Sequence, residues 1–147
     1  MKKQNEVIDS LIETLKDGQE GFKQAADSVT DEKLKSLFRD YSQQRSRFAA
    51  ALQNEARSHG QTKPETSSSA TGALHRGWIN LKSAITGGND HAILAECERG
   101  EDSAVEAYKK ALDDGLTPSA QELVTRQFAD IKAAHDRIKS LRDATKS

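Results

Sequence analysis

The chain has 147 residues, with 22 basic and 23 acidic side chains and a formal net charge of −1. We expect residues 1–147 to form a single helical-bundle domain, because this length is typical of one domain. No stretch approaches the ~20 apolar residues of a membrane span, and 31% of the residues are charged. The composition therefore excludes an integral membrane protein, and its neutral balance argues against nucleic-acid binding driven by bulk charge.

The cysteine content and the N-terminus point to a cytoplasmic protein. A single cysteine, Cys97, excludes an intramolecular disulfide. The first residues, MKKQNEVIDS, contain two lysines but no apolar segment after them. We therefore expect no secretory signal.

Apolar residues recur at steps of three and four over four long segments, which predicts four amphipathic helices. The expected ranges are residues 5–29, 31–58, 90–114 and 118–142. Thr30, Asn89 and Thr117 precede the last three segments and are expected to be their N-caps. Pro118 suits the first position of the last helix, where its missing N–H leaves no hydrogen bond unmade.

The segment between the second and third long helices has a different composition. Residues 58–72, SHGQTKPETSSSATG, have no apolar face and predict a flexible linker. Residues 73–86 predict a short crossover helix with Trp78 on its apolar face. A crossover of this length spans a long helix. It therefore favours an up-down-down-up bundle over an up-down-up-down one, with Trp78 docked on the bundle or in a dimer contact.

Charge is distributed unevenly among the long helices. Residues 31–57 carry six basic and four acidic side chains, and residues 117–146 carry the same numbers. Residues 90–114 carry three basic and eight acidic side chains. The basic faces of the second and fourth long helices are the only support for nucleic-acid binding, which we do not expect.

Polar residues interrupt the apolar stripes near the helix midpoints, and midpoints share one layer in an antiparallel bundle. They are Gln44 and Arg45 in the second helix, Glu101 in the third, and Gln127 and His135 in the fourth. These residues predict a buried polar layer. A buried carboxylate is strongly unfavourable without a partner, so we expect either Gln44 or Arg45 to face Glu101.

Two interpretations of this layer compete, a metal centre and a structural network. Di-metal bundles direct a Glu from each of two helices and a Glu-x-x-His pair from each of the other two toward the axis. Here Glu101 and His135 would be the available ligands, but the first helix offers Leu15 at this level and no Glu-x-x-His pair is present. The ligand count favours the structural network, and we expect no metal and no cofactor.

Three segments carry a resemblance to a known group of proteins. They are SLIETLKDGQEGFKQAA (10–26), HRGWINLKSAITGGNDHAILAECERGEDSAVEAYKKAL (75–112) and RQFADIKAAHDRIKSLRD (126–143). In these segments the chain resembles a family of small bacterial ferritin-like four-helix-bundle proteins of unknown function. The resemblance implies an all-α, ferritin-like up-down-down-up bundle and a role in stress physiology, and it brings no established reaction.

Together these observations predict a protein that is not an enzyme. We expect a non-catalytic ferritin-like bundle that acts through a protein-interaction surface, as a homodimer or with an unknown protein partner. The alternative is a divergent metal-binding or redox protein with a site around Glu101 and His135.

Overall fold

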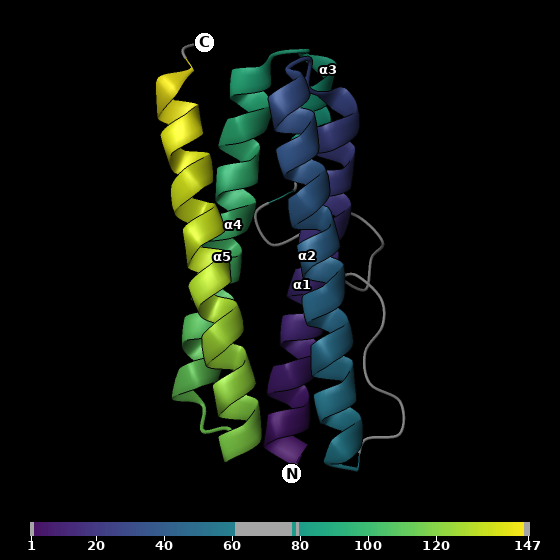
Figure 1. Ribbon diagram of the computed structural model, residues 1–147, viewed down its shortest axis with the longest axis vertical. Coiled ribbons are helices and arrows are strands. Elements are labelled where there is room, and N and C mark those ends of the chain that lie inside the picture. The colour runs from purple at the N-terminus through teal and green to yellow at the C-terminus, as the bar shows by residue number, and fades with distance from the viewer. Residues whose placement is uncertain (1, 61–77, 79, 146–147) are drawn as a thin grey trace.

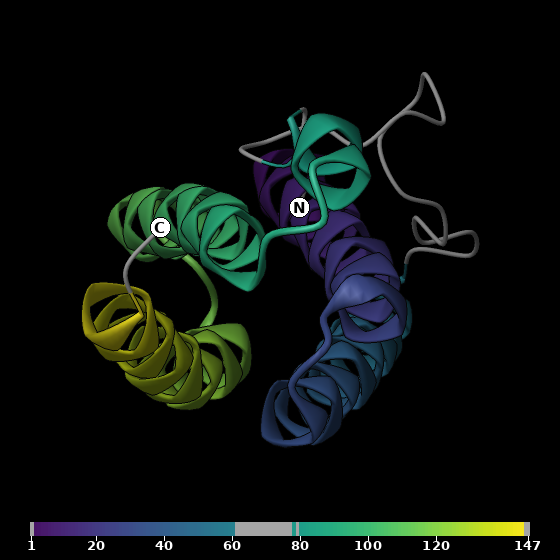
Figure 2. The same cartoon turned by 90° about the horizontal axis from the view of Figure 1, so that it is seen from above.

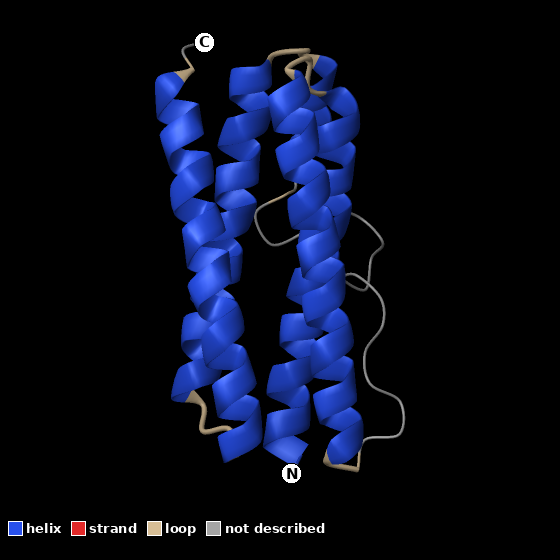
Figure 3. Cartoon of the chain, in the orientation of Figure 1, coloured by secondary structure: helices blue, strands red, loops and turns tan. Residues whose placement is uncertain are grey.

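The computed structural model describes residues 2–60, 78 and 80–145, and these residues form five helices and no β-strand (Figure 3). The helices are α1 (Lys2–Ser28), α2 (Glu32–Ser58), α3 (Leu81–Thr86), α4 (Asp90–Asp113) and α5 (Pro118–Ala144). The prediction of an all-helical chain is therefore confirmed for the described residues. Among the described residues, no helix has the length and apolar character that spanning a membrane requires.

The four long helices form two antiparallel pairs (Figure 1). Helices α1 and α5 run in one direction and α2 and α4 run in the other. Seen from above, α1 pairs with α2 and α4 pairs with α5, while α1 also packs against α4 (Figure 2). Helix α3 packs on α1 and α4 near one end of the bundle. This order of directions is compatible with a ferritin-like bundle.

The turn between α1 and α2 corrects one predicted cap. Asp31, not Thr30, caps α2, because its Oδ1 accepts the backbone N–H of Lys33 at 2.7 Å and that of Leu34 at 3.4 Å. Thr30 donates its backbone N–H and its hydroxyl to the Asp90 carboxylate, at 2.9 and 3.0 Å. The backbone N–H of Asp31 adds a third bond to Asp90 at 3.1 Å. Asp90 therefore ties this turn to the beginning of α4.

The other two predicted caps have different outcomes. Asn89 caps α4, since its Oδ1 accepts the backbone N–H of His91 at 2.8 Å. Thr117 holds the N-cap position of α5, but its side chain makes no capping hydrogen bond. Its backbone N–H donates instead to Oε1 of Gln4, at 2.6 Å. The beginning of α5 is thus tied to the beginning of α1.

Trp78 packs on the bundle, which is one of the two positions that the sequence left open. Its side chain is buried, and its indole lies against the backbone of Gly21 in α1 and Gly100 in α4. A Cβ atom at either glycine would overlap the indole ring. The indole also meets the Phe22 ring edge-on, with centroids 5.1 Å apart. Two glycines, one on each helix, therefore make the space that this side chain fills.

The predicted crossover lies only partly within the described residues. Ser58 belongs to α2, and the rest of the predicted linker from residue 61 onward lies outside the described residues. The same holds for residues 73–77 and 79 of the predicted short helix. In the part that the structure describes, the helix is shorter than predicted: it runs from Leu81 to Thr86, so Trp78 lies before it and Asn80 is its N-cap. Leu81 is buried against the bundle.

Candidate functional site

Arg45 and Glu101 form a buried ion pair between α2 and α4. Arg45 Nη1 donates to Glu101 Oε1 at 2.5 Å, and Nη2 donates to Oε2 at 2.7 Å. The two side chains are 1% and 0% exposed. Both carboxylate oxygens thus face one guanidinium, the bidentate geometry in which such pairs are strongest.

The remaining surroundings of Arg45 keep its charge satisfied. Gln44 is half-buried, and its Oε1 accepts the Arg45 Nε–H at 3.1 Å. The guanidinium carbon lies 5.2 Å from the centroid of the Phe22 ring, within the range of a cation–π contact. Burial alone would lower the pKa of Arg45, but the Glu101 carboxylate outweighs this and raises it. Of the two candidates, Arg45 therefore faces Glu101, and Gln44 lies at the edge of the pair.

Gln127 is buried, but it belongs to a separate network. The Tyr108 hydroxyl donates to Gln127 Oε1 at 2.8 Å, and Gln127 Nε2 donates to the backbone carbonyl of Phe48 at 3.2 Å. Burial raises the pKa of Tyr108, so its hydroxyl stays protonated and remains a donor. The predicted polar layer is thus two adjoining groups, one ionic and one neutral.

His135 does not lie in the buried layer, which corrects its predicted position. It follows Ala134, the buried residue of this turn of α5, and its side chain is 19% exposed at the α4–α5 surface. Its Nε2 lies 2.6 Å from Asp102 Oδ1, and its Nδ1 lies 3.1 Å from Asp136 Oδ1. Burial alone would lower the pKa of His135, but the hydrogen bonds to Asp136 and Asp102 raise it.

Two carboxylates of α4, Glu98 and Asp102, lie near His135. The sequence interpretation did not include either of them in the polar layer. Glu98 and Asp102 lie four residues apart on α4, and each places an oxygen within 4.8 Å of the other and of a His135 ring nitrogen. Glu98 is buried, and its Oε1 also lies 2.6 Å from Arg142 Nη1. The four-residue spacing of Glu98 and Asp102 was the available signal, since such residues share a helix face.

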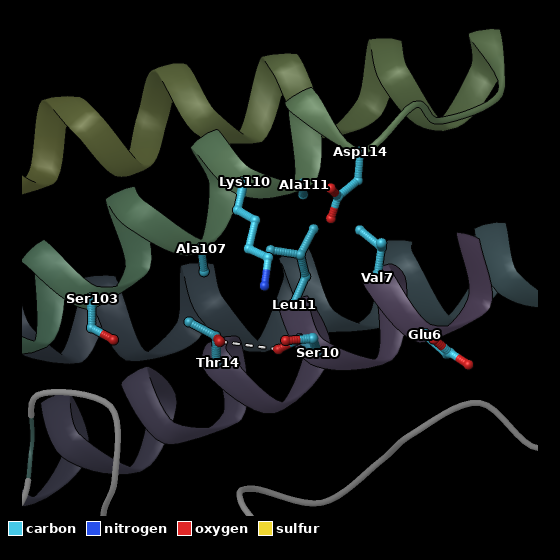
Figure 4. A pocket seen from close by; sticks show the side chains of 10 residues that line it. All are labelled: Glu6, Val7, Ser10, Leu11, Thr14, Ser103, Ala107, Lys110, Ala111 and Asp114. Carbon is cyan, nitrogen blue, oxygen red and sulfur yellow. Dashed lines mark hydrogen bonds between the residues drawn. The ribbon is translucent and has the colours of Figure 1, made fainter. Parts of the chain in front are cut away.

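The α1–α4 groove is a hollow of about 350 Å³ on the opposite flank of α4 (Figure 4). Its walls are lined by Glu6, Val7, Ser10, Leu11 and Thr14 from α1, and by Ser103, Ala107, Lys110 and Ala111 from α4, with Asp114 at one end. The groove lies along the same two helices that receive Trp78 at Gly21 and Gly100. It begins about one turn after Gly100 on α4, at Ser103, and about two turns before Gly21 on α1, at Thr14. Small side chains therefore line both stretches, but only one of them is filled by an indole.

Lys110 is the cation that points into this groove (Figure 4). Within the described residues, its ammonium makes no hydrogen bond or ion pair. The floor beside it is apolar, formed by Leu11 and Ala107. Sequence reasoning missed this groove because small polar residues on a helix face are also what a solvated face contains.

A protein-family model described as Domain of unknown function (DUF2383) matches residues 3–114. The matched range includes the Arg45–Glu101 pair and every residue that lines the α1–α4 groove, and it ends before α5 begins. No curated protein matches the chain.

Proposed function

The chain belongs to the family described as Domain of unknown function (DUF2383), and on that premise we propose that it is a non-catalytic, ferritin-like bundle that binds a partner protein through the α1–α4 groove. The observation that carries this proposal is a stretch of the groove that no described residue fills, beside the stretch that Trp78 fills. A role in stress physiology is part of the proposal, and it rests only on the family resemblance of the three sequence segments.

The core chemistry supports a non-catalytic protein. A di-metal centre would need carboxylates on the bundle axis that are free to bind ions. Glu101 is buried between the helices, and both of its oxygens are bound by Arg45. Glu101 therefore has both of its oxygens engaged by a guanidinium, and among the described residues it is not part of the group that could hold a metal ion.

The proposed occupant of the groove is a short amphipathic helix of another protein. The chain itself supplies the precedent, since Trp78, which lies just before α3, and Leu81, the first residue of α3, bury apolar side chains against the neighbouring stretch of α1 and α4. Helix-in-groove recognition of this kind uses apolar anchors spaced three or four residues apart. We expect an apolar anchor over Ala107 and an acidic side chain opposite Lys110, because that ammonium has no ionic partner among the described residues.

Photo-crosslinking in the native host tests this proposal. A benzoylphenylalanine at Ala107 should crosslink to one partner segment, while the same group at Ala129, exposed on α5, should not. Lys110→Glu should abolish the crosslink. Replacement of the acidic residue of the partner by Lys should then restore it. The charge-swap rescue distinguishes recognition from accidental capture.

Each other result overturns the proposed partner. A crosslink to a second copy of the chain would make the groove a homodimer contact. A crosslink to nucleic acid would assign the protein to another class. Equal yields from Ala107 and Ala129 would show that the groove has no dedicated occupant.

The alternative function is a divergent metal-binding or redox protein with a site around Glu101 and His135. Of these two residues, only His135 lies in a group that could hold a metal ion, together with Glu98 and Asp102. Glu101 pairs with Arg45 in the core, whereas His135 pairs with Asp102 at the α4–α5 surface. Metal analysis of untagged protein tests this alternative. Stoichiometric iron or manganese that is lost in Glu101→Gln would overturn the non-catalytic proposal.

A further inference from the structure

The α4–α5 surface brings three metal-ligand side chains to one point. Glu98 and Asp102 lie one turn apart on α4, and His135 reaches them from α5. One ligand atom of each lies within 4.8 Å of the other two. The sequence separation between the two helices means that the fold, rather than a local motif, assembles this group.

His135 is held in the orientation that a metal-binding histidine needs. Its Nε2 faces Asp102, and its Nδ1 lies 3.1 Å from Asp136 Oδ1. In metal sites, the second ring nitrogen typically donates to a carboxylate, which fixes the tautomer and the ring plane. Asp136 is placed to do this from outside the ligand set.

We propose that Glu98, Asp102 and His135 bind a divalent first-row transition-metal ion, with Asp136 as the group that orients the histidine. One imidazole nitrogen and two carboxylate oxygens suit Zn²⁺ and its neighbours, whereas Mg²⁺ prefers ligand sets made of oxygen alone. The Asp102 side chain is 58% exposed, so water would complete the coordination. The site shares no residue with the α1–α4 groove and stands independently of the function proposed above.

Arg142 competes with the metal ion for Glu98. Its Nη1 lies 2.6 Å from Glu98 Oε1, an ion pair that lacks the alignment of a hydrogen bond. Its Nη2 donates to Asp143 at 2.8 Å, so the guanidinium keeps a partner when it leaves Glu98. Removing Arg142 should therefore strengthen metal binding, which a merely structural role of these residues does not predict.

Calorimetric titration of untagged, metal-free protein with Zn²⁺ tests the site. We expect one ion per chain, and affinity at least tenfold lower in His135→Ala and in Asp102→Asn. Asp136→Asn should weaken binding by a factor of about 10, as removal of such orienting groups does in other metal sites. Arg142→Gln should increase the affinity severalfold, and Mg²⁺ should not compete.

His59→Gln is the matched control. His59 also faces a carboxylate, with Nε2 2.7 Å from Glu55 Oε2, but it lies outside the proposed ligand set. We expect this variant to bind Zn²⁺ as the unmodified protein does. Circular dichroism checks that each variant is folded.

A second measurement needs no variant of the site. In the unmodified protein, Zn²⁺ should shift the ring ¹⁵N resonances of His135 and leave those of His91 in place. Unchanged His135 resonances, equal affinity in His135→Ala, or loss of binding in His59→Gln would each overturn the proposal.

Discussion

Glu101 and Asp102 are consecutive residues of α4 that have opposite surroundings. Glu101 is fully buried and is bound by a guanidinium, whereas the Asp102 side chain is 58% exposed and faces an imidazole. Consecutive side chains of a helix are rotated by about 100° around its axis. This rotation is enough to place one carboxylate in the bundle core and the next at its surface. The buried pair holds fixed charges. The surface group contains an imidazole, which can gain or lose a proton and which we propose as a metal ligand.

The largest effect should follow from breaking the buried pair. Arg45→Met leaves Glu101 buried without a counter-ion, and loss of one partner of such a pair destabilises by about 3–5 kcal/mol. Urea unfolding followed by circular dichroism measures this. The double variant Arg45→Met/Glu101→Leu should recover most of the loss, because no buried charge remains. A change near zero in Arg45→Met would contradict the pairing.

An intermediate effect is expected one residue earlier on α4, at Gly100. In Gly100→Ala the new methyl group would overlap the indole of Trp78, and overpacking of this kind destabilises by about 1–3 kcal/mol. Trp78 is the chain's only tryptophan, so its fluorescence should shift to longer wavelength as the indole leaves its place. Gly18→Ala is the control, since its Cβ would make only ordinary van der Waals contact, at 3.4 Å from Arg45 Nη1. Equal fluorescence in both variants would contradict the docking of Trp78.

The smallest effect should come from the surface pair. His135→Ala should destabilise the metal-free protein by less than about 1 kcal/mol, as is typical of exposed pairs. Because the pKa of His135 is raised, its stabilising contribution is fully present below the ordinary value of 6.5. It is lost as the pH rises through the folded-state pKa. Urea unfolding with a chelator at about pH 6 and at about pH 9 should show a larger loss at the lower pH.

The sequence predicted the helices well, because a periodic apolar stripe is repeated over many residues. Its errors and its open alternatives concern positions where two neighbouring residues could fill the same role. Thr30 and Asp31 are both good N-caps, but Thr30 donates its hydroxyl to Asp90, which lies 60 residues further along the chain. Similarly, the stripe of α2 allowed Gln44 or Arg45 to face the core, and the need of Glu101 for a counter-ion selects Arg45.

The surface features were harder to predict because they depend on how two helices meet. His135 lies at the edge of its stripe, so periodicity alone could place it in the core or at the surface. Its partners Asp102 and Glu98 are on another helix, so their distances from His135 are set by how α4 packs against α5. Likewise, Ser103 and Ala107 become walls of a groove only when α1 lies alongside.

The bridge made by Asp90 has a consequence for the order in which the chain folds. It joins groups 60 residues apart in sequence, whereas each helical hairpin closes through a turn of a few residues. Because closing a longer loop costs more chain entropy, the hairpins should form first and the bridge last. Asp90 would then have little influence on the folding rate, and its removal would chiefly shorten the lifetime of the native state.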